Sequence, residues 1–588
     1  MAQDPNHSRR DFLKGLTASA FAAATGIALS ACDDDDNEDN GSPTADQASP
    51  AITYTSGVAS GDPLNDRVIL WTRTLPAAVE TVTEVTGRWE IAADEAFAQV
   101  ISQGDFQTSA AQDFTVKVDA TGLSAGNTYY YRFQVGTQTS PVGRTKTLPT
   151  GNISQAKFAL FSCSNYPAGY FHVYQLAAQD DYDAVLHVGD YIYEYGAGGY
   201  ASQDAEALGR VVEPPTELFS LADYRRRYAQ YRSDPDLQAL HAKVPWIVVW
   251  DDHEVANNAY VTGAENHDPS EGDFASRRAA AVQAYHEWLP IRAPDAANLL
   301  QIYRRFAYGD LLTLHMLDTR LLGRDQQLSL TDPDFASKVA DPDRQLLGEA
   351  QMDWLLTGLQ TSTATWEVLG QQVIMGRVVI PQSILAAALN ADGTPNPEGF
   401  DAALSAYLTA LQTPAAARSE QQQALVNPNQ NPLAPYNPDA WDGYFAARET
   451  ILNAAAQQAK NLVVLSGDSH NSWGLNLATY GSDGTDGVPA GVEFAGTSVS
   501  SPGFEGPESF ALNTAEAAQL AAALTQIVPG LEYANLYHRG FVKVTFTQEH
   551  ADAEYIHVDT VKASSYQAPD ELAKTLRVPV NSNVLSTA

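Results

Sequence analysis

Four short apolar runs of the chain each end in side chains that bind metal ions in other proteins. These side chains are a thiol, a phenol, an imidazole, an amide and several carboxylates. Carboxylates and thiolates repel one another in a partly dry cleft unless a cation neutralises them. The set as a whole therefore predicts a metal centre. The candidate ligands are Cys163, Asp190, Tyr193, Asp252, Asn257, Asp468 and His470.

The ligand types indicate two kinds of metal. A thiolate, a phenolate and an imidazole suit a redox-capable or borderline transition metal, and ferric iron is the natural partner of a tyrosinate. Asp252, Asn257 and Asp468 form a harder oxygen site, of the kind that calcium or magnesium accepts. Asp190 could bridge the two sites. A bridged pair of metals can hold a hydroxide and clamp a phosphoryl oxygen for in-line displacement.

Cys163 is of interest because the chain has only two cysteines. The other one, Cys32, lies at the end of an apparent export signal, where it is either removed or acylated. Cys163 then has no intramolecular disulfide partner. It is either a buried structural thiol or a metal thiolate.

Residues 1–32 have the pattern of an export signal. The stretch SRRDFLK resembles a twin-arginine motif, and the moderately apolar run that follows is too short to span a bilayer comfortably. LSAC resembles a lipobox, in which Cys32 would carry a lipid; the alternative is that it is lost with the signal. Residues 33–50 are acidic and then rich in Ser, Pro and Gly, which predicts a flexible linker.

The elements that must position the ligands fall into two regions. Residues 51–149 consist of short alternating segments broken by turn residues, which predicts a small immunoglobulin-like or fibronectin-like β-sandwich. Residues 151–565 alternate apolar strands with helical stretches, and ligand sites of such α/β folds gather at the carboxyl ends of the strands. We expect a helical insertion at about 380–442, either lining the pocket or decorating the surface, and a final β-hairpin before the tail, 566–588.

The chain is strongly acidic. Its 588 residues include 71 Asp and Glu against 35 Lys and Arg, a net charge of −36, and 44% are hydrophobic. The overall field therefore repels polyanions, and no specific nucleic-acid partner is expected. We expect a monomer that meets the twin-arginine export machinery and touches a membrane only through a lipid on Cys32. This predicts an exported bacterial protein, located in the periplasm, on the outer surface or anchored to a membrane.

The order of Cys163, GDYIY, WDDHE and GDSH resembles the calcineurin-like metallophosphoesterases and purple acid phosphatases. It is most similar to the PhoD-type alkaline phosphatase and phosphodiesterase branch, and GVASGDPLNDRVILWTR extends the similarity to the N-terminal region. The resemblance implies a four-layer α/β/β/α sandwich preceded by the small all-β domain. It also implies Fe³⁺ held by Cys163, Asp190, Tyr193 and His470, and one or two Ca²⁺ near Asp190, Asp252, Asp468 and Asn257.

Two positions depart from the pattern of the wider superfamily. Asp252 stands where the Asn of Gly-Asn-His-Glu would be, and Asp468 stands where the first His of Gly-His-x-His would be. Both changes harden the second site toward calcium. Asp251 is a competing ligand there.

The resemblance implies a phosphatase that hydrolyses phosphate monoesters and/or diesters by attack of a metal-bound hydroxide, and that releases phosphate for nutrition. His253 would stabilise charge or protonate the leaving alkoxide; alternatively it makes a supporting hydrogen bond to Asp468 or another ligand. One competing function is a phospholipase-D-like phosphodiesterase acting on lipid or teichoic-type diesters. Another is a surface lipoprotein whose metals are purely structural.

Overall fold

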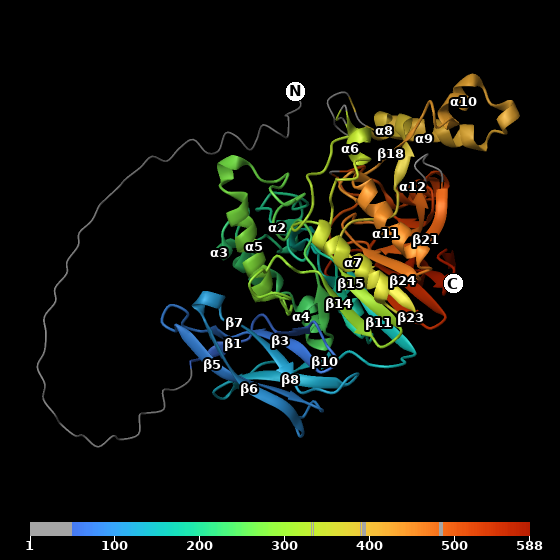
Figure 1. Ribbon diagram of the computed structural model, residues 1–588. Coiled ribbons are helices and arrows are strands. Elements are labelled where there is room, and N and C mark those ends of the chain that lie inside the picture. Colours follow the sequence, from blue (N-terminus) through green and yellow to red (C-terminus); the bar gives the residue numbers. More distant parts are fainter. Residues whose placement is uncertain are drawn as a thin grey trace, which may run out of the picture. The chain divides into compact units, whose positions relative to one another are not determined.

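The computed structural model describes residues 50–587, except 331, 333, 389, 391–395, 481–485 and 508. The predicted signal with Cys32, and all but the last residue of the predicted linker, lie outside the described residues. Residues 49–588 form one compact unit (Figure 1). No helix in the described part of the chain combines the length and the apolar character needed to cross a membrane.

The N-terminal region is all β, as predicted. One of its layers is a five-stranded antiparallel sheet, and the other is formed by three strands that continue into the main sheet of the molecule. A separate apolar core fills the space between them, with Leu70, Phe106 and Phe133 among its buried residues. The first layer contains β5 (Glu84–Ala92), β6 (Val100–Ser109), β8 (Thr128–Val135), β9 (Gln138–Thr139) and β10 (Gly143–Lys146). The second contains β2 (Val58–Gly61), β3 (Arg67–Arg73) and β7 (Thr115–Thr121).

The remainder is built on two large mixed sheets of ten and seven strands. In the ten-stranded sheet, β11, β12 and β13 run parallel, so their carboxyl ends lie at one edge. The N-terminal strands join this sheet where β13 pairs with β2, through Trp246 and Gly61. The three parallel strands are β11 (Gln155–Phe161), β12 (Ala184–His187) and β13 (Trp246–Val248).

The seven-stranded sheet is buried on both of its faces, which is why helices cover its outer face. In β19 (Leu462–Ser466), Val463 and Leu465 belong to the core between the sheets, whereas Leu462 and Val464 belong to the core under the outer helices. Side chains alternate between the two faces of a strand, so a continuous apolar run becomes buried on both. The sheet also contains β14 (Arg304–Tyr308), β15 (Leu312–Met316), β16 (Trp366–Gly370), β20 (Ser472–Tyr480), β21 (Asp486–Ala495) and β22 (Leu531–Asn535).

Helices pack on the outer face of each sheet, which confirms the predicted α/β/β/α order of layers. Residues of α1, α3, α4 and α5 belong to the same large core as Val463 and Leu465, which includes residues on both faces of the ten-stranded sheet. Residues of α7, α11 and α12 belong to the core under the outer helices of the seven-stranded sheet. The first group is α1 (His172–Ala177), α3 (Leu221–Tyr231), α4 (Pro235–Lys243) and α5 (Phe274–Trp288). The second is α7 (Glu349–Thr361), α11 (Phe445–Gln457) and α12 (Thr514–Ile527).

The predicted insertion is helical (Figure 1). It contains α8 (Gln382–Ala387), α9 (Pro397–Gln412) and α10 (Glu420–Val426), and the strands β17 (Val379–Pro381) and β18 (Leu433–Pro435) pair at its base. Proline at the first position of α9 is suited to a helix start, because its missing N–H would have no intrahelical acceptor there.

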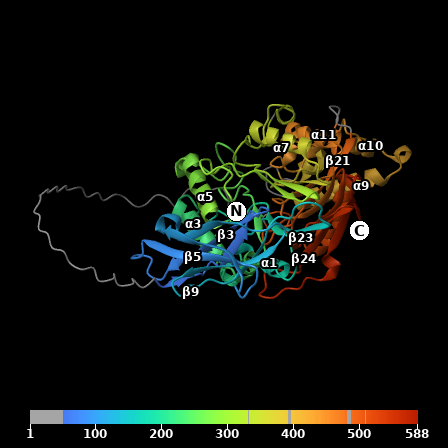
Figure 2. The same cartoon turned by 60° about the horizontal axis from the view of Figure 1, so that its bottom comes forward.

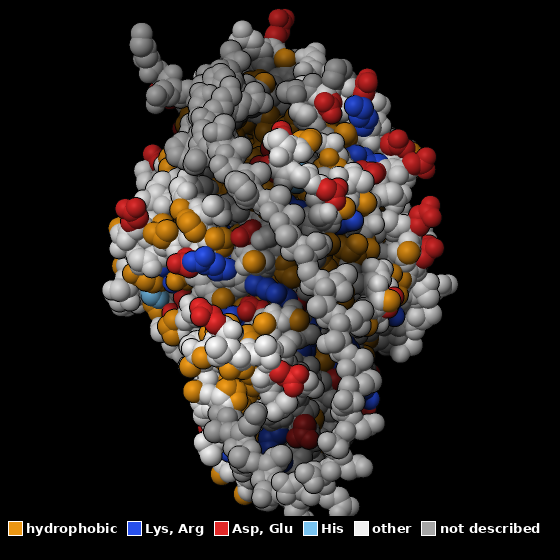
Figure 3. All heavy atoms as spheres, turned by 90° about the vertical axis from the view of Figure 1, so that its left-hand side faces the viewer, with side chains coloured by type: hydrophobic (Ala, Val, Ile, Leu, Met, Phe, Trp, Pro, Cys, Tyr) orange, Lys and Arg blue, Asp and Glu red, His pale blue; other side chains and the backbone are white. Residues whose placement is uncertain are grey.

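The predicted final hairpin is also present, formed by β23 (Arg539–Thr547) and β24 (His550–Val558). It lies beside α1, as Figure 2 shows. The tail then continues the ten-stranded sheet, because β25 (Lys574–Pro579) pairs with β24 and β26 (Ser586–Thr587) pairs with β25. On the face drawn in Figure 3, acidic side chains are spread over the described surface, in keeping with the net charge of −36.

Candidate metal centre

Most of the predicted ligands follow the carboxyl ends of four strands, as the apolar runs indicated. Cys163 follows β11, Asp190 follows β12 and Asp252 follows β13, all in the ten-stranded sheet. Asp468 and His470 follow β19 of the other sheet. The structure thus brings together side chains that are up to about 300 positions apart in the sequence.

One cluster consists of Cys163, Asp190 and His470, whose ligand atoms all lie within 4.8 Å of one another. Tyr193 belongs to the same cluster. Its hydroxyl donates to Asp190 Oδ2 at 2.9 Å and lies 3.2 Å from His470 Nε2. Ser501 Oγ donates to the same phenol oxygen at 2.7 Å. A thiol, a carboxylate, a phenol and an imidazole therefore lie close together.

The hydrogen bonds of His470 fix its tautomer. Its Nδ1 lies 2.8 Å from the carbonyl oxygen of Pro502, which can only accept, so Nδ1 carries the proton. Burial lowers the pKa of His470 to about 3, so the ring is neutral and Nε2 keeps a lone pair toward Tyr193. Second hydrogen bonds of this kind orient histidines that bind metals.

Two further clusters extend the first. Asp190, Asp252 and His253 form one, and Asp251, Asp252 and Asp468 form the other, again with ligand atoms within 4.8 Å. Asp190 is shared by the first two clusters and Asp252 by the last two. The candidate ligands therefore form a continuous acidic centre with room for more than one cation.

The centre is electrostatically unfavourable without a cation. Burial raises the pKa of the Cys163 thiol and of Asp190 well above their ordinary values, and neighbouring carboxylates add to both effects. Asp190 Oδ1 and Asp251 Oδ2 are buried and have no hydrogen-bond partner among the described residues. Because an unpaired buried carboxylate oxygen costs several kcal/mol, these residues fit a site built for metal ions.

The backbone at these positions is strained in the same way. Cys163, Asp190, Asp468 and His470 have φ angles of 61°, 56°, 61° and 60°. Residues with a β-carbon seldom adopt this left-handed conformation, which costs on the order of 1–3 kcal/mol at each position. Such strain is concentrated at functional sites, where the gain in function outweighs the loss in stability.

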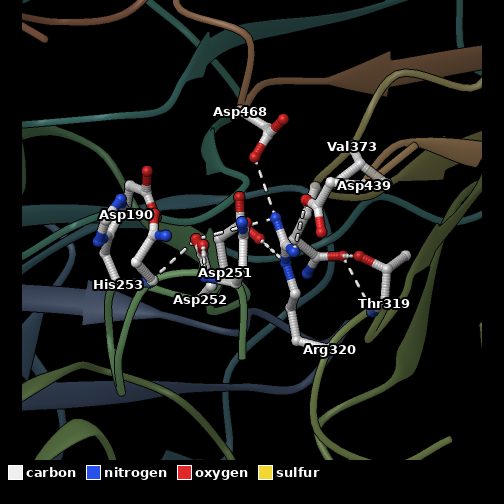
Figure 4. A network of polar contacts seen from close by, with 12 residues as sticks. Asp190, Asp251, Asp252, His253, Thr319, Arg320, Val373, Asp439 and Asp468 are labelled. Carbon is white, nitrogen blue, oxygen red and sulfur yellow. Dashed lines mark hydrogen bonds and ion pairs between the residues drawn. The ribbon is translucent and has the colours of Figure 1, made fainter. Parts of the chain in front are cut away.

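Arg320 lies among the carboxylates and was missed by sequence reasoning (Figure 4). It is fully buried, and its Nε donates to Asp251. Its Nη2 donates to Asp468 Oδ1 at 3.0 Å and its Nη1 to Asp439 Oδ2 at 2.7 Å. Burial raises the pKa of Asp468 to about 7, although the charge of Arg320 opposes this. A signal was present, since LDTR places polar residues directly after the apolar run that forms β15.

His253 forms a supporting hydrogen bond to Glu194, which was not among the predicted ligands. Its Nδ1 lies 2.7 Å from Glu194 Oε2, so the supporting hydrogen bond goes to Glu194 and not to Asp468. Although burial opposes it, the charges of Asp252, Asp190 and Glu194 raise the pKa of His253 well above its ordinary value. Nearby carboxylates therefore favour the protonated form of His253, and Glu194 fixes the orientation of its ring.

Glu254, also missed, links the loops that follow β12 and β13. Its Oε2 accepts the backbone N–H groups of Asp190 at 3.0 Å and Asp251 at 2.7 Å, and its Oε1 accepts that of Tyr191 at 2.6 Å. One carboxylate thus holds the backbones of two candidate ligands in register. The residue was overlooked because a glutamate after a strand has many ordinary roles.

Other predicted residues have supporting roles. Asn257 is placed by its backbone N–H, which donates to Glu194 Oε1 at 2.9 Å. The arginines of 224–234 have other partners: Arg225 pairs with Glu287, Arg226 pairs with Glu213, and Arg227 and Arg232 donate to backbone carbonyls.

Comparisons with known proteins identify the family of the chain. Residues 158–555 match the family model of the PhoD-like phosphatases, and residues 40–149 match the model of that family's N-terminal domain. Alkaline phosphatase D of Bacillus subtilis (strain 168) is 36% identical over 511 residues, which is 85% of this chain and 77% of that protein.

A solved structure described as "Structure of PhoD" superposes with a TM-score of 0.73 at 33% identity and covers 93% of each chain. This match confirms the predicted fold, and the family match confirms the resemblance seen in the motifs. The chain belongs to the PhoD-like phosphatase family.

Proposed function

We propose that this enzyme hydrolyses phosphate monoesters and/or diesters at a centre of Fe³⁺ and one or two Ca²⁺. The observation that carries the proposal is the convergence of three ligand clusters joined by Asp190 and Asp252. Cys163, Asp190, Tyr193 and His470 would hold iron, which suits thiolate, phenolate and imidazole ligands. Asp190, Asp252 and Asp468, with Asn257 or Asp251, would hold calcium, which prefers oxygen ligands.

The residues around the centre suit the chemistry of phosphoryl transfer. When bound, the metals would supply Lewis acidity toward phosphoryl oxygens and increase the acidity of water. His253 is the candidate acid, because Glu194 holds its Nδ1 and nearby carboxylates favour its protonated form. Its Nε2 would donate a proton to the departing alkoxide. Arg320 would keep the carboxylates from repelling one another.

The N-terminal motifs support an exported enzyme. A twin-arginine signal would let the folded protein take up its metals before translocation. Lipidation of Cys32 would then tether a monomer to a membrane through the acidic linker. There the enzyme would release phosphate from small esters for nutrition. Alkaline phosphatase D, the B. subtilis relative, is named for phosphatase activity, which supports the class of substrate.

Metal analysis tests this proposal. The protein without its signal, purified with no added metal, should contain iron and calcium and hydrolyse p-nitrophenyl phosphate, bis(p-nitrophenyl) phosphate or both. A visible band from tyrosinate bound to iron should disappear in Tyr193→Phe. It should remain in Tyr191→Phe, because the Tyr191 hydroxyl binds His241 instead. Zinc alone, or a band unaffected by Tyr193→Phe, would overturn the assignment of the metals.

A further inference from the structure

An apolar cavity of ≈ 280 Å³ lies behind the loop that carries Asp468 and His470. Most of its described lining residues come from the insertion and from the segment around α12, and all of these described lining residues except Ser509 have apolar or aromatic side chains. Trp473, Tyr436 and Phe504 form its inner end. Both ring pairs are in contact, with Tyr436 and Phe504 centroids 5.4 Å apart and Trp473 and Phe504 centroids 6.2 Å apart.

The inner end of this cavity adjoins the metal centre. The indole N–H of Trp473 donates to Ser469 Oγ at 2.7 Å, and Ser469 is the residue between Asp468 and His470. The cavity wall and the candidate ligands therefore share one loop.

A second cavity, of ≈ 740 Å³, adjoins the first and is lined by residues of α9 and α12. The two share Phe400, Phe510 and Leu520 in their walls, and the rings of Phe400 and Phe510 are 5.1 Å apart. Polar residues such as Asp401 and Gln519 appear only in the outer cavity. An apolar path thus leads from the outer groove to the neighbourhood of Asp468.

We propose that this path binds the alkyl chain of an amphiphilic phosphate ester, with its phosphate at the metal centre. The proposal rests on the function proposed above and specifies its substrate class. A chain suits the site better than a polar alcohol because the described residues that line the inner cavity include no charged side chain and only two hydroxyl groups, those of Ser509 and Tyr436. It suits the site better than a single aromatic ring because the two cavities adjoin each other along shared walls.

A chain-length series tests the proposal on the metal-loaded enzyme. The substrates are p-nitrophenyl n-alkyl phosphates from methyl to octyl, used below the concentration at which they form micelles. We expect kcat/KM to rise roughly two- to fourfold per methylene, as expected for burying a CH₂ group. The dissociation constants of n-alkyl phosphonates, measured by calorimetry, should fall with chain length in the same way.

Three variants locate the effect. Leu385→Gln alters a half-buried residue of the inner cavity and should flatten the dependence on chain length, leaving the methyl ester unaffected. Leu408→Gln, in the outer cavity, should weaken only the longest chains. Leu411→Gln is the matched control, since Leu411 is exposed on α9 and lines neither cavity.

The outcomes separate the two proposals. If no ester is hydrolysed, the proposed function fails. If the methyl ester is hydrolysed but kcat/KM does not depend on chain length, or if Leu385→Gln and Leu411→Gln behave alike, the alkyl site alone is overturned. A last comparison identifies the source of the chain. If the enzyme hydrolyses a phospholipid in vesicles as well as it hydrolyses a monomeric alkyl ester, the substrate is a membrane lipid. If it hydrolyses the monomeric ester alone, the substrate is a free amphiphile.

Discussion

At the scale of single residues, the candidate centre is defined by buried charges that need partners. Arg320 illustrates this, because its guanidinium lies among Asp251, Asp439 and Asp468 and is fully buried (Figure 4). The planar fork of an arginine can donate to several carboxylates at once, which the point charge of a lysine cannot do. Removing Arg320 would leave several carboxylates unpaired in a dry environment.

We therefore predict that Arg320→Met lowers the free energy of unfolding by about 3–5 kcal/mol, the usual cost of breaking a buried ion pair. The free energy of unfolding of Arg320→Lys should lie between those of Arg320→Met and the wild type. Urea unfolding of the metal-loaded proteins measures both changes.

The matched control is Arg226→Met. Arg226 pairs with Glu213 at the surface, where the two side chains are 58% and 56% exposed, so its loss should cost at most about 1 kcal/mol. Equal destabilisation by Arg320→Met and Arg226→Met would show that Arg320 does not neutralise the acidic cluster.

At the scale of elements, the centre depends on how the strand ends are held together. The loops after β12 and β13 are far apart in the sequence, yet Glu254 accepts backbone N–H groups from both. Glu254→Gln preserves the shape of the side chain but turns one acceptor into a donor that faces a backbone N–H. A buried donor without an acceptor costs about 1–3 kcal/mol.

We predict that Glu254→Gln weakens metal binding about 10- to 100-fold, the typical effect of losing a group that orients ligands. Competition with a chelator, followed by elemental analysis, measures this change. Glu213→Gln, at an exposed ion pair, should leave metal affinity unchanged. If both variants retain the metals equally, Glu254 does not position the ligands.

The sequence predicts strand ends well and long-range partners poorly. Apolar runs followed by polar residues placed Cys163, Asp190 and Asp468 directly after the ends of buried strands, because the periodicity of burial is a local property. The partners of Arg320 are not local: Asp251, Asp439 and Asp468 lie 69, 119 and 148 positions away. No local pattern in LDTR indicates which carboxylates a buried arginine will meet, and the same holds for the pairing of His253 with Glu194.

The insertion shows the same limit at the level of an element. Its composition indicated helices but left open whether they line a pocket or face solvent. Both occur, because Leu408 lines the outer cavity while Leu411, one turn later on α9, is exposed. Only the placement of α9 opposite α12, across the outer cavity, decides between the two, and these helices are more than a hundred residues apart in the sequence.

At the scale of the whole molecule, the net charge of −36 opposes the approach of an anionic substrate. A local cluster of metal cations must capture phosphate against this field. Salt screens the repulsion between distant surface charges, since the Debye length falls from about 30 Å at 0.01 M to about 8 Å at 0.15 M ionic strength. The short-range attraction of a buried metal centre is screened much less.

We therefore predict that kcat/KM for p-nitrophenyl phosphate, a dianion at alkaline pH, rises by at least about twofold as sodium chloride is raised over this range. p-Nitrophenyl phosphorylcholine is the matched control, because it presents a phosphodiester with no net charge and should show little dependence on salt. A decrease in kcat/KM for the dianion would mean that cations near the centre dominate the field along the path of entry. The global charge would then matter for solubility and not for substrate capture.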